Sequence, residues 1–228
     1  MATRSAAVSF DAAMRRIAEA ARRSGRGPDE VTLVVVSKGR SEGEILSIYQ
    51  KGHRDFGENR AAEIAEKAAR LPRDIHWHFV GPLQTNKVRM VRPVTYLLHS
   101  LDRERLAAAW VKGPGRPPPV LVEVNIGKEP QKGGVAPDRA GDLMRSAIDL
   151  GLEVRGLMAI PPQVPDPEGV RPYFRRLAEM RDELGRTIVL PVLSMGMSDD
   201  FEVAVEEGAT VVRLGRAIFS PGGDDGIT

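Results

Sequence analysis

Eight short apolar segments alternate with segments of helical pattern along this sequence. The apolar segments predict β-strands at residues 32–37, 55–57, 77–80, 96–100, 120–125, 154–159, 189–194 and 210–214. The segments between them predict helices at residues 42–51, 59–70, 86–91, 102–111, 137–150, 168–184 and 199–207. Eight strands that alternate with helices are typical of the (β/α)8 barrel, or TIM barrel, so we predict an α/β fold with a single barrel domain over residues 1–228.

An open, doubly wound sheet is the main alternative with the same alternation. Folds of that kind that bind dinucleotides carry G-x-G-x-x-G after the first strand, and this chain has none there. The Pro/Gly-rich stretch at residues 112–119 lies between a predicted helix and the fifth strand, so we interpret it as a surface loop and not as a domain boundary. The barrel is therefore the favoured architecture.

The first 30 residues predict an extra helix packed on the barrel. The pattern places five residues on one helical face: Phe10, Ala13, Met14, Ile17 and Ala21. The composition of this region resembles that of an organelle transit peptide, but its acidic residues and apolar stripe favour a structural helix. Residues 220–228 are expected to form a tail.

Three predicted helices are followed directly by glycine, at Gly52, Gly151 and Gly208. Glycine adopts the left-handed conformation that commonly ends a helix, so we expect a left-handed cap at each position.

The composition excludes several classes of function. The chain has no cysteine, which excludes disulfides, thiolate catalysis and cysteine-based zinc sites, and is compatible with a cytoplasmic location. We predict no metal site. The formal net charge is +2 and the basic residues are scattered, so we expect no nucleic-acid partner. No apolar stretch approaches the roughly 20 residues of a membrane span, so we expect no membrane partner.

Lys38 follows the first strand directly and is the first candidate for chemistry. A lysine at the mouth of a buried strand can be partly desolvated, which favours the neutral amine that forms a Schiff base with an aldehyde. Alternatively, Lys38 only ends the strand and extends into water, as strand-terminal lysines often do.

Polar residues also follow most of the other strands. The carboxyl ends of the strands carry Lys38, residues 57–59, His78, His99, Asn125, Met158, residues 194–198 and residues 213–216. Active sites of barrels are built at this end. The loops after strands seven and eight often bind phosphate there, and Ser198 and Gly215 lie in these loops. Ser198 could alternatively cap the helix that follows it. An imine-forming lysine with a phosphate site points to a phosphorylated aldehyde, and pyridoxal 5′-phosphate (PLP) is the leading candidate.

Motifs from Val31 to Phe219 resemble, in order, those of the pyridoxal phosphate homeostasis protein family, single-domain relatives of the alanine racemase N-terminal barrel. The resemblance rests on Val35-Val36-Ser37-Lys38, Phe56-Gly57-Glu58-Asn59, Trp77-His78-Phe79-Val80-Gly81, Leu83-Gln84-Thr85-Asn86-Lys87, Gly156-Leu157-Met158, Leu193-Ser194-Met195-Gly196-Met197-Ser198-Asp199 and Val212-Arg213-Leu214-Gly215.

The resemblance implies a site for PLP. It implies that Lys38 carries the cofactor as an aldimine and that Arg213 faces the pyridine nitrogen. It also implies that Ser198 and the backbone at Gly215 and Arg216 hold the phosphate. It further implies that Asn59 and His78 line the pocket near the ring. For His78, a hydrogen-bonded role in the barrel wall is an equal alternative.

The sequence departs from the family pattern at two places. Gly39-Arg40-Ser41 stands where the family has a small polar residue, Lys and Pro, and Pro82 stands where a histidine is more usual. These changes could alter the loop over the cofactor and the entrance to the pocket.

The resemblance implies a cofactor carrier in intracellular PLP homeostasis that buffers PLP or delivers it to apo-enzymes. Related racemases use a second domain and a second acid or base. The chain ends soon after strand eight and none of its tyrosines, at positions 49, 96 and 173, is placed for that role. We therefore expect a monomer with no catalytic residue and no dedicated turnover. The alternatives are a low-activity amino-acid racemase or lyase, and a barrel for another phosphorylated metabolite with Lys38 as an aldolase-type lysine.

Overall fold

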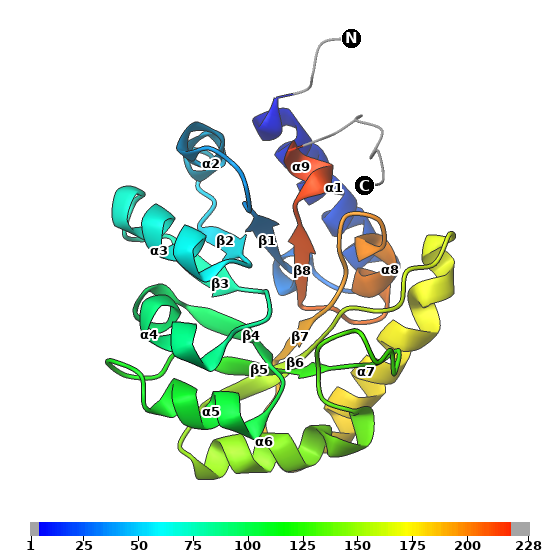
Figure 1. Cartoon of the computed structure of the whole chain (residues 1–228). Helices are drawn as coiled ribbons and strands as arrows, with labels where there is room; N and C mark the ends of the chain where they lie inside the picture. Colours follow the sequence, from blue (N-terminus) through cyan, green and yellow to red (C-terminus); the bar gives the residue numbers. More distant parts are fainter. Residues whose placement is uncertain (1–4, 220–228) are drawn as a thin grey trace.

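The computed structural model describes residues 5–219, so the predicted tail at 220–228 and residues 1–4 lie outside the described residues. Eight parallel strands form a closed barrel in the order β1 to β8 (Figure 1). The strands are β1 (Thr32–Val36), β2 (Asp55–Glu58), β3 (His76–Phe79), β4 (Leu97–Leu101), β5 (Val120–Val124), β6 (Val154–Ala159), β7 (Val192–Ser194) and β8 (Val211–Leu214). The predicted barrel is confirmed.

Helices surround the barrel and cover its outer face (Figure 1). They are α1 (Ala6–Arg23), α2 (Glu42–Tyr49), α3 (Ala61–Arg70), α4 (Val88–Val91), α5 (Glu104–Val111), α6 (Ala140–Asp149), α7 (Arg171–Leu184), α8 (Phe201–Glu206) and α9 (Arg216–Phe219). Short 3-10 turns precede several of them, including Thr85–Lys87 before α4 and Pro137–Arg139 before α6. Six of the seven helices predicted between the strands begin two or three residues later than the sequence pattern predicts, because such turns and loops take up the first residues, whereas α2 begins at the predicted Glu42.

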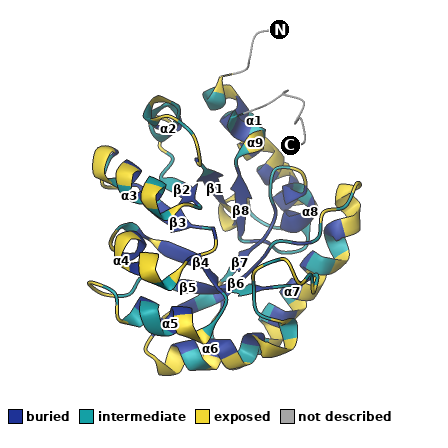
Figure 2. Ribbon diagram, in the orientation of Figure 1, coloured by how far each residue is buried: buried dark blue, intermediate teal, exposed yellow. Residues whose placement is uncertain are grey.

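The main core fills the space between strands and helices, and the strands are the most buried layer (Figure 2). Successive residues of a strand point to opposite faces, so one set faces the helices and the other faces the barrel interior. A small second cluster of Leu97, Leu121 and Met158 fills part of that interior. Polar side chains also lie in the interior, among them His78, His99, Ser194 and Arg213, and they are hydrogen-bonded to one another.

The predicted extra helix, α1, packs against α2, α8 and α9. Four of the five residues that we assigned to its apolar face are buried, but Met14 is 38% exposed. Ser9 and Ala20 take part in the buried stripe instead, because its centre is rotated away from Met14. The placement of Met14 on the packed face was therefore wrong.

The predicted glycine caps are confirmed at all three positions, with φ of +91° at Gly52, +86° at Gly151 and +96° at Gly208. Strand β7 is shorter than predicted. Val189 is 84% exposed, and Pro191 has no N–H for the ladder, so the strand begins at Val192. Within residues 5–219, no helix has the length and apolar character needed to cross a bilayer.

Candidate functional site

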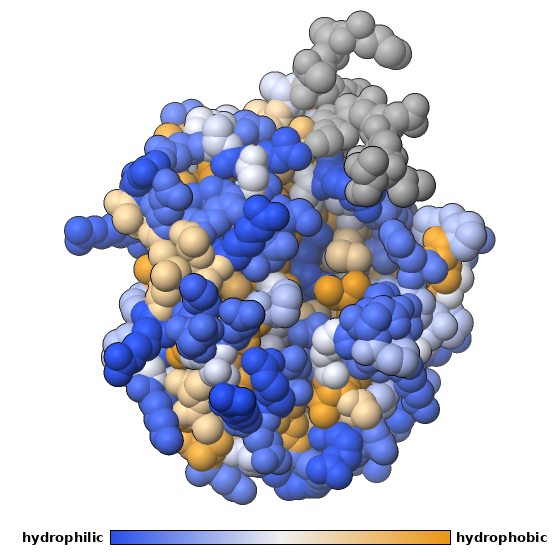
Figure 3. All heavy atoms as spheres, viewed as in Figure 1, coloured by the Kyte–Doolittle hydropathy of each residue, from blue (hydrophilic) through white to orange (hydrophobic). Residues whose placement is uncertain are grey.

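Strands β1 and β8 are neighbours and bring two of the predicted site residues to one end of the barrel. Val34 lies opposite Arg213 in the parallel pair, and Lys38 follows four residues further along the chain. A Cβ placed on Gly215 would lie 3.2 Å from the carbonyl oxygen of Val36, so the backbones approach closely there. Above the middle of the barrel the molecular surface is hollowed, and both hydrophilic and hydrophobic side chains border the hollow (Figure 3).

Lys38 is exposed, so the partial desolvation that the sequence suggested for its amine is not observed. Its backbone neighbours are nevertheless fixed on both sides. The carbonyl of Ser37 accepts a 2.6 Å hydrogen bond from Lys67 Nζ, and the N–H of Gly39 donates a 2.5 Å hydrogen bond to Glu63 Oε1. Gly39 has φ of +68°, a left-handed conformation that glycine adopts without strain. The chain therefore presents a free side chain on an anchored backbone.

The anchor is a buried ionic cluster, here called the Lys67 cluster, formed by Ser37, Glu58, Glu63 and Lys67. The ammonium group of Lys67 has three N–H donors, and three oxygens accept them: Ser37 O, Glu58 Oε1 at 2.6 Å and Glu63 Oε1 at 2.7 Å. Ser37 Oγ donates a further 2.7 Å hydrogen bond to Glu58. Burial raises the pKa of Glu58, although Lys67 and Ser37 oppose that shift.

Arg213 lies inside the barrel and is only 4% exposed. Its guanidinium donates to Ser194 Oγ at 2.6 Å and to the carbonyl of Ala159 at 3.1 Å. Burial lowers the pKa of Arg213 to about 10, with Glu123 and Asp200 opposing the shift, so the group is a cation at neutral pH. It offers a fixed positive charge with further N–H donors to spare.

The loops after β7 and β8 meet at Ser198, as a shared anion site requires. Ser198 Oγ accepts a 3.1 Å hydrogen bond from the backbone N–H of Ala217. The alternative role of Ser198 as a helix cap is wrong, because α8 begins only at Phe201 and Asp200 is its N-cap residue. Arg216 is exposed, and its side chain forms an ion pair with Asp199 at 2.5 Å.

Asn59 and His78 differ in what they offer a ligand. Asn59 Oδ1 is buried and has no hydrogen-bond partner among the described residues. Gly81 allows the next loop to pack on Asn59, since a Cβ on Gly81 would lie 2.5 Å from its carbonyl oxygen. His78 is 2% exposed, and both ring nitrogens contact protein groups, His99 at 2.9 Å and Asp55 at 3.1 Å. This geometry favours the barrel-wall alternative for His78.

Several residues connected to the site were not identified from the sequence. Glu63, Lys67 and Glu123 lie near it, and Asp55 is linked to it through His78; all four are ordinary charged residues in their local sequence. Glu123 follows the inward-facing Leu121 by two residues on β5. Burial, and to a lesser extent Asp102, raises the pKa of Glu123 to about 7, whereas Arg213 opposes the rise. A signal for Glu123 was its charge within a buried strand, where such a group is expensive unless it is functional.

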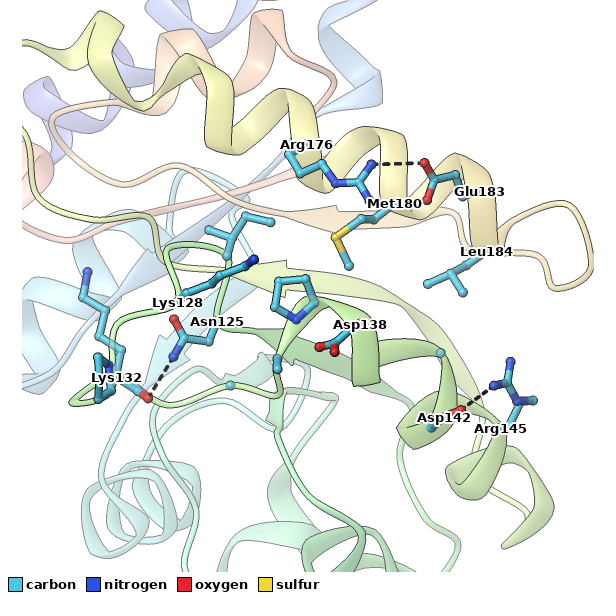
Figure 4. Close-up of a pocket in the computed structure, with 16 residues that line it drawn as sticks. Asn125, Lys128, Lys132, Asp138, Asp142, Arg145, Arg176, Met180, Glu183 and Leu184 are labelled. Carbon is cyan, nitrogen blue, oxygen red and sulfur yellow. Dashed lines mark hydrogen bonds and ion pairs between the residues drawn. The ribbon is translucent and has the colours of Figure 1, made fainter.

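A separate cavity of 1110 Å³ lies between α6 and α7, beside the loop at residues 125–136 (Figure 4). Met180 and Leu184 line it from α7. Charges at its rim are paired with one another, as Arg145 bonds to Asp142 and Arg176 to Glu183. None of the seven residues predicted to bind a cofactor lines this cavity, so the candidate site lies elsewhere, at the barrel mouth.

Comparison with known proteins gives a consistent result over the whole barrel. The chain matches the family of the alanine racemase N-terminal domain over residues 8–221. It is 46% identical over 213 residues to the pyridoxal phosphate homeostasis protein of Aquifex aeolicus, a match that covers 90% of this chain and 93% of that protein. It is 41% identical over 221 residues to the pyridoxal phosphate homeostasis protein of Deinococcus radiodurans, covering 93% of this chain and 100% of that protein.

Solved structures with similar folds include PipY of Synechococcus elongatus with PLP bound. That structure has a TM-score of 0.74 and 33% identity, and the match covers 90% of this chain and 100% of PipY. Alanine racemase of Corynebacterium glutamicum shares the fold at a TM-score of 0.69 and 17% identity, covering 96% of this chain but 63% of the racemase.

Proposed function

Because this chain belongs to the alanine racemase N-terminal domain family and, within it, to the pyridoxal phosphate homeostasis proteins, we propose that it binds PLP and serves in PLP homeostasis. The observation that carries the proposal is the convergence of Lys38, Arg213 and the Ser198–Ala217 contact at one end of the barrel. These groups supply an amine, a cation and an anion site, which match the aldehyde, ring nitrogen and phosphate of PLP.

The residues present fit this cofactor. The amine of Lys38 is exposed on an anchored backbone, so it is free to form a Schiff base with the aldehyde. Ser198, the backbone at Gly215 and Arg216 would hold the phosphate, since the loops after β7 and β8 meet at the Ser198–Ala217 contact. The unpartnered Oδ1 of Asn59 is a buried acceptor that a ligand group could satisfy.

When bound, PLP supplies an electrophilic aldehyde and an electron-accepting ring. Arg213 would direct an N–H to the ring nitrogen and, as a donor, would leave that nitrogen unprotonated. This arrangement limits the ring as an electron acceptor and suits storage more than turnover.

We infer that the chain carries PLP without dedicated turnover. The three tyrosines support this, because none has its hydroxyl at the site: Tyr49 bonds to Asp74 on the outer surface, Tyr96 stacks on His76 at the opposite end of the barrel, and Tyr173 lies on α7. The exposure of Lys38 also favours delivery of PLP, because an amine of another molecule could reach the bond between Lys38 and the cofactor. The recipients would be PLP-accepting apo-enzymes, and we propose a cytoplasmic monomer.

A low-activity racemase or lyase is the second candidate, and Glu123 is the observation that favours it. A carboxyl group with a pKa of about 7 can donate or accept a proton at neutral pH. Incubation of the PLP-loaded protein with L-alanine in D₂O tests this: solvent deuterium at Cα, lost in Glu123→Gln, would establish the enzyme and contradict the carrier.

The proposed binding is tested by borohydride trapping. Purified protein is mixed with PLP, the visible imine band is recorded, and the reduced protein is digested and mapped by mass spectrometry. We expect one pyridoxyl group on Lys38, and none in Lys38→Ala. Lys112→Ala, which removes an exposed lysine outside the barrel mouth, is the matched control. Labelling scattered over surface lysines would overturn the proposal.

A further inference from the structure

Five side chains form a continuous hydrogen-bonded chain through the barrel interior, here called the interior chain. It runs from Arg213 to Ser194 Oγ at 2.6 Å, from Ser194 Oγ to His99 Nδ1 at 2.9 Å, and from His99 Nε2 to His78 Nδ1 at 2.9 Å. His78 Nε2 then reaches Asp55 Oδ1 at 3.1 Å. Asp55 is the first residue of β2, so the chain links the candidate site to the opposite end of the barrel.

The two ends of the interior chain fix the direction of every hydrogen bond. An ionised Asp55 can only accept, so His78 must donate from Nε2. A neutral imidazole has one donor and one acceptor, so His78 Nδ1 accepts from His99 Nε2–H, and His99 Nδ1 in turn accepts from the hydroxyl of Ser194. Ser194 Oγ is then free to accept from Arg213, which can only donate.

Burial keeps the two imidazoles neutral, as this direction requires. His78 is 2% exposed, and His99 and Ser194 are fully buried. Burial lowers the pKa of His78 and lowers that of His99 well below its usual value, with Arg213 and the neighbouring imidazole adding to the effect at His99. The pKa of Asp55 is held below its usual value by His78 and His76, which outweigh its burial. His76 Nδ1 also contacts Asp55 Oδ1, at 3.2 Å.

We propose that Ser194, His99, His78 and Asp55 are positioning residues, which hold the Arg213 guanidinium in one orientation toward the ring nitrogen of PLP. This inference rests on the proposed function for the identity of the ligand. With Nη1 bonded to Ser194 and Nη2 to Ala159, the guanidinium plane is fixed and its remaining N–H groups keep one direction. Within the interior chain only Arg213 directs N–H groups toward the ring, because the hydrogens of Ser194, His99 and His78 point away from it.

The first test is the tautomeric state of the histidines in the unliganded protein, which does not depend on PLP binding. The chain has four histidines, so ¹⁵N correlation spectra can be assigned with His53→Gln and His76→Gln, two variants outside the interior chain. We expect His78 and His99 to be neutral at pH 7 with the proton on Nε2. An imidazolium, or a proton on Nδ1, at either residue would overturn the proposal.

The second test asks whether a substitution at Asp55 changes the tautomer of a histidine that Asp55 does not contact. Asp55→Ala removes the terminal acceptor, so we expect His99, which does not hydrogen-bond to residue 55, to become a mixture of both tautomers. Asp55→Asn retains an acceptor oxygen and should keep a single tautomer. A single unchanged tautomer of His99 in Asp55→Ala would contradict a directional chain.

The third test measures PLP binding after Arg213 loses its anchor. Ser194→Ala should weaken PLP binding about tenfold, because a hydrogen bond to a charged group is removed, and Ser194→Thr should restore it. The control is Ser100→Ala, since Ser100 is another buried serine and its hydroxyl has no partner among the described residues. Equal losses in Ser100→Ala and Ser194→Ala would overturn the proposal. Trapping on Lys38 in the wild type separates this result from failure of PLP binding itself.

Discussion

Lys38 follows β1 and Arg213 lies on the neighbouring strand β8, yet the protein holds the two residues in opposite ways. At Lys38 the Lys67 cluster fixes the backbone on both sides and leaves the side chain exposed. At Arg213 the interior chain fixes the side chain itself, which is buried. A group that forms and breaks a covalent bond needs freedom at its reactive atom, whereas a group that makes one polar contact benefits from a fixed orientation. The two anchors also differ in kind, since the Lys67 cluster is ionic and lies outside the barrel interior, whereas Arg213 is held from inside by neutral side chains that end at the carboxylate of Asp55.

The largest effect is expected for Lys38→Ala, which removes the free side chain and leaves its anchor intact. Covalent PLP binding should be lost completely, while thermal unfolding should stay within about 2 °C of the wild type, because an exposed side chain contributes little to packing. Borohydride trapping and calorimetry measure the two results. Unfolding of Lys38→Ala under native conditions would show that this lysine has a structural role.

Lys67→Met should break the Lys67 cluster. It leaves Glu58, which is fully buried, without its cation, and breaking a buried pair in this way costs about 3–5 kcal/mol. Urea denaturation measures the loss. The double variant Lys67→Met/Glu58→Gln removes both charges and should recover part of the stability; a double variant as unstable as Lys67→Met would show that packing, and not charge, is lost.

Glu123→Gln should change how stability depends on pH. The pKa of Glu123 is raised from 4.5 to about 7 in the folded protein, so the folded state binds more protons than the unfolded state between these values. The contribution of this group to the free energy of unfolding is therefore fully present below about pH 4.5, and it is lost as the pH rises through about 7. Above that range the variant should be more stable than the wild type by up to about 3 kcal/mol. Parallel pH profiles from denaturation would contradict this.

The smallest effect is expected for Glu63→Gln, which keeps an oxygen near Gly39 but removes the charge. We expect a loss of about 1 kcal/mol and faster hydrogen exchange at the Gly39 amide, which donates to Glu63. Glu66→Gln is the matched control on the same helix, since its ion pair with Arg70 is exposed and should contribute at most about 0.5 kcal/mol. Equal losses of stability in Glu63→Gln and Glu66→Gln would show that Glu63 does not help to anchor the backbone at Gly39.

The sequence was informative where the physical cause is local. Alternation of apolar residues predicted all eight strands, and the glycines after three helices predicted their caps. Lys38 was chosen as the candidate amine because it directly follows a buried strand, and its role stays a prediction.

The parts that could not be predicted depend on register across the barrel. His99 and Ser194 are 95 residues apart in sequence, and their contact exists only because strands β4 and β7 face each other across the closed interior. Lys67 lies on α3, the helix that follows the strand of Glu58, and only the packing of α3 on β2 shows that its ammonium group is buried. Charged residues of this kind look like surface residues until the fold is known.

The Lys67 cluster has a consequence for behaviour on heating. The desolvation cost of buried charges falls as temperature rises, whereas apolar burial gains little further strength. An ionic anchor therefore weakens less than its surroundings in a warming protein. We expect the segment around Lys38 to be among the last parts of the barrel to loosen, so that the lysine proposed to bind the cofactor keeps its place until global unfolding begins.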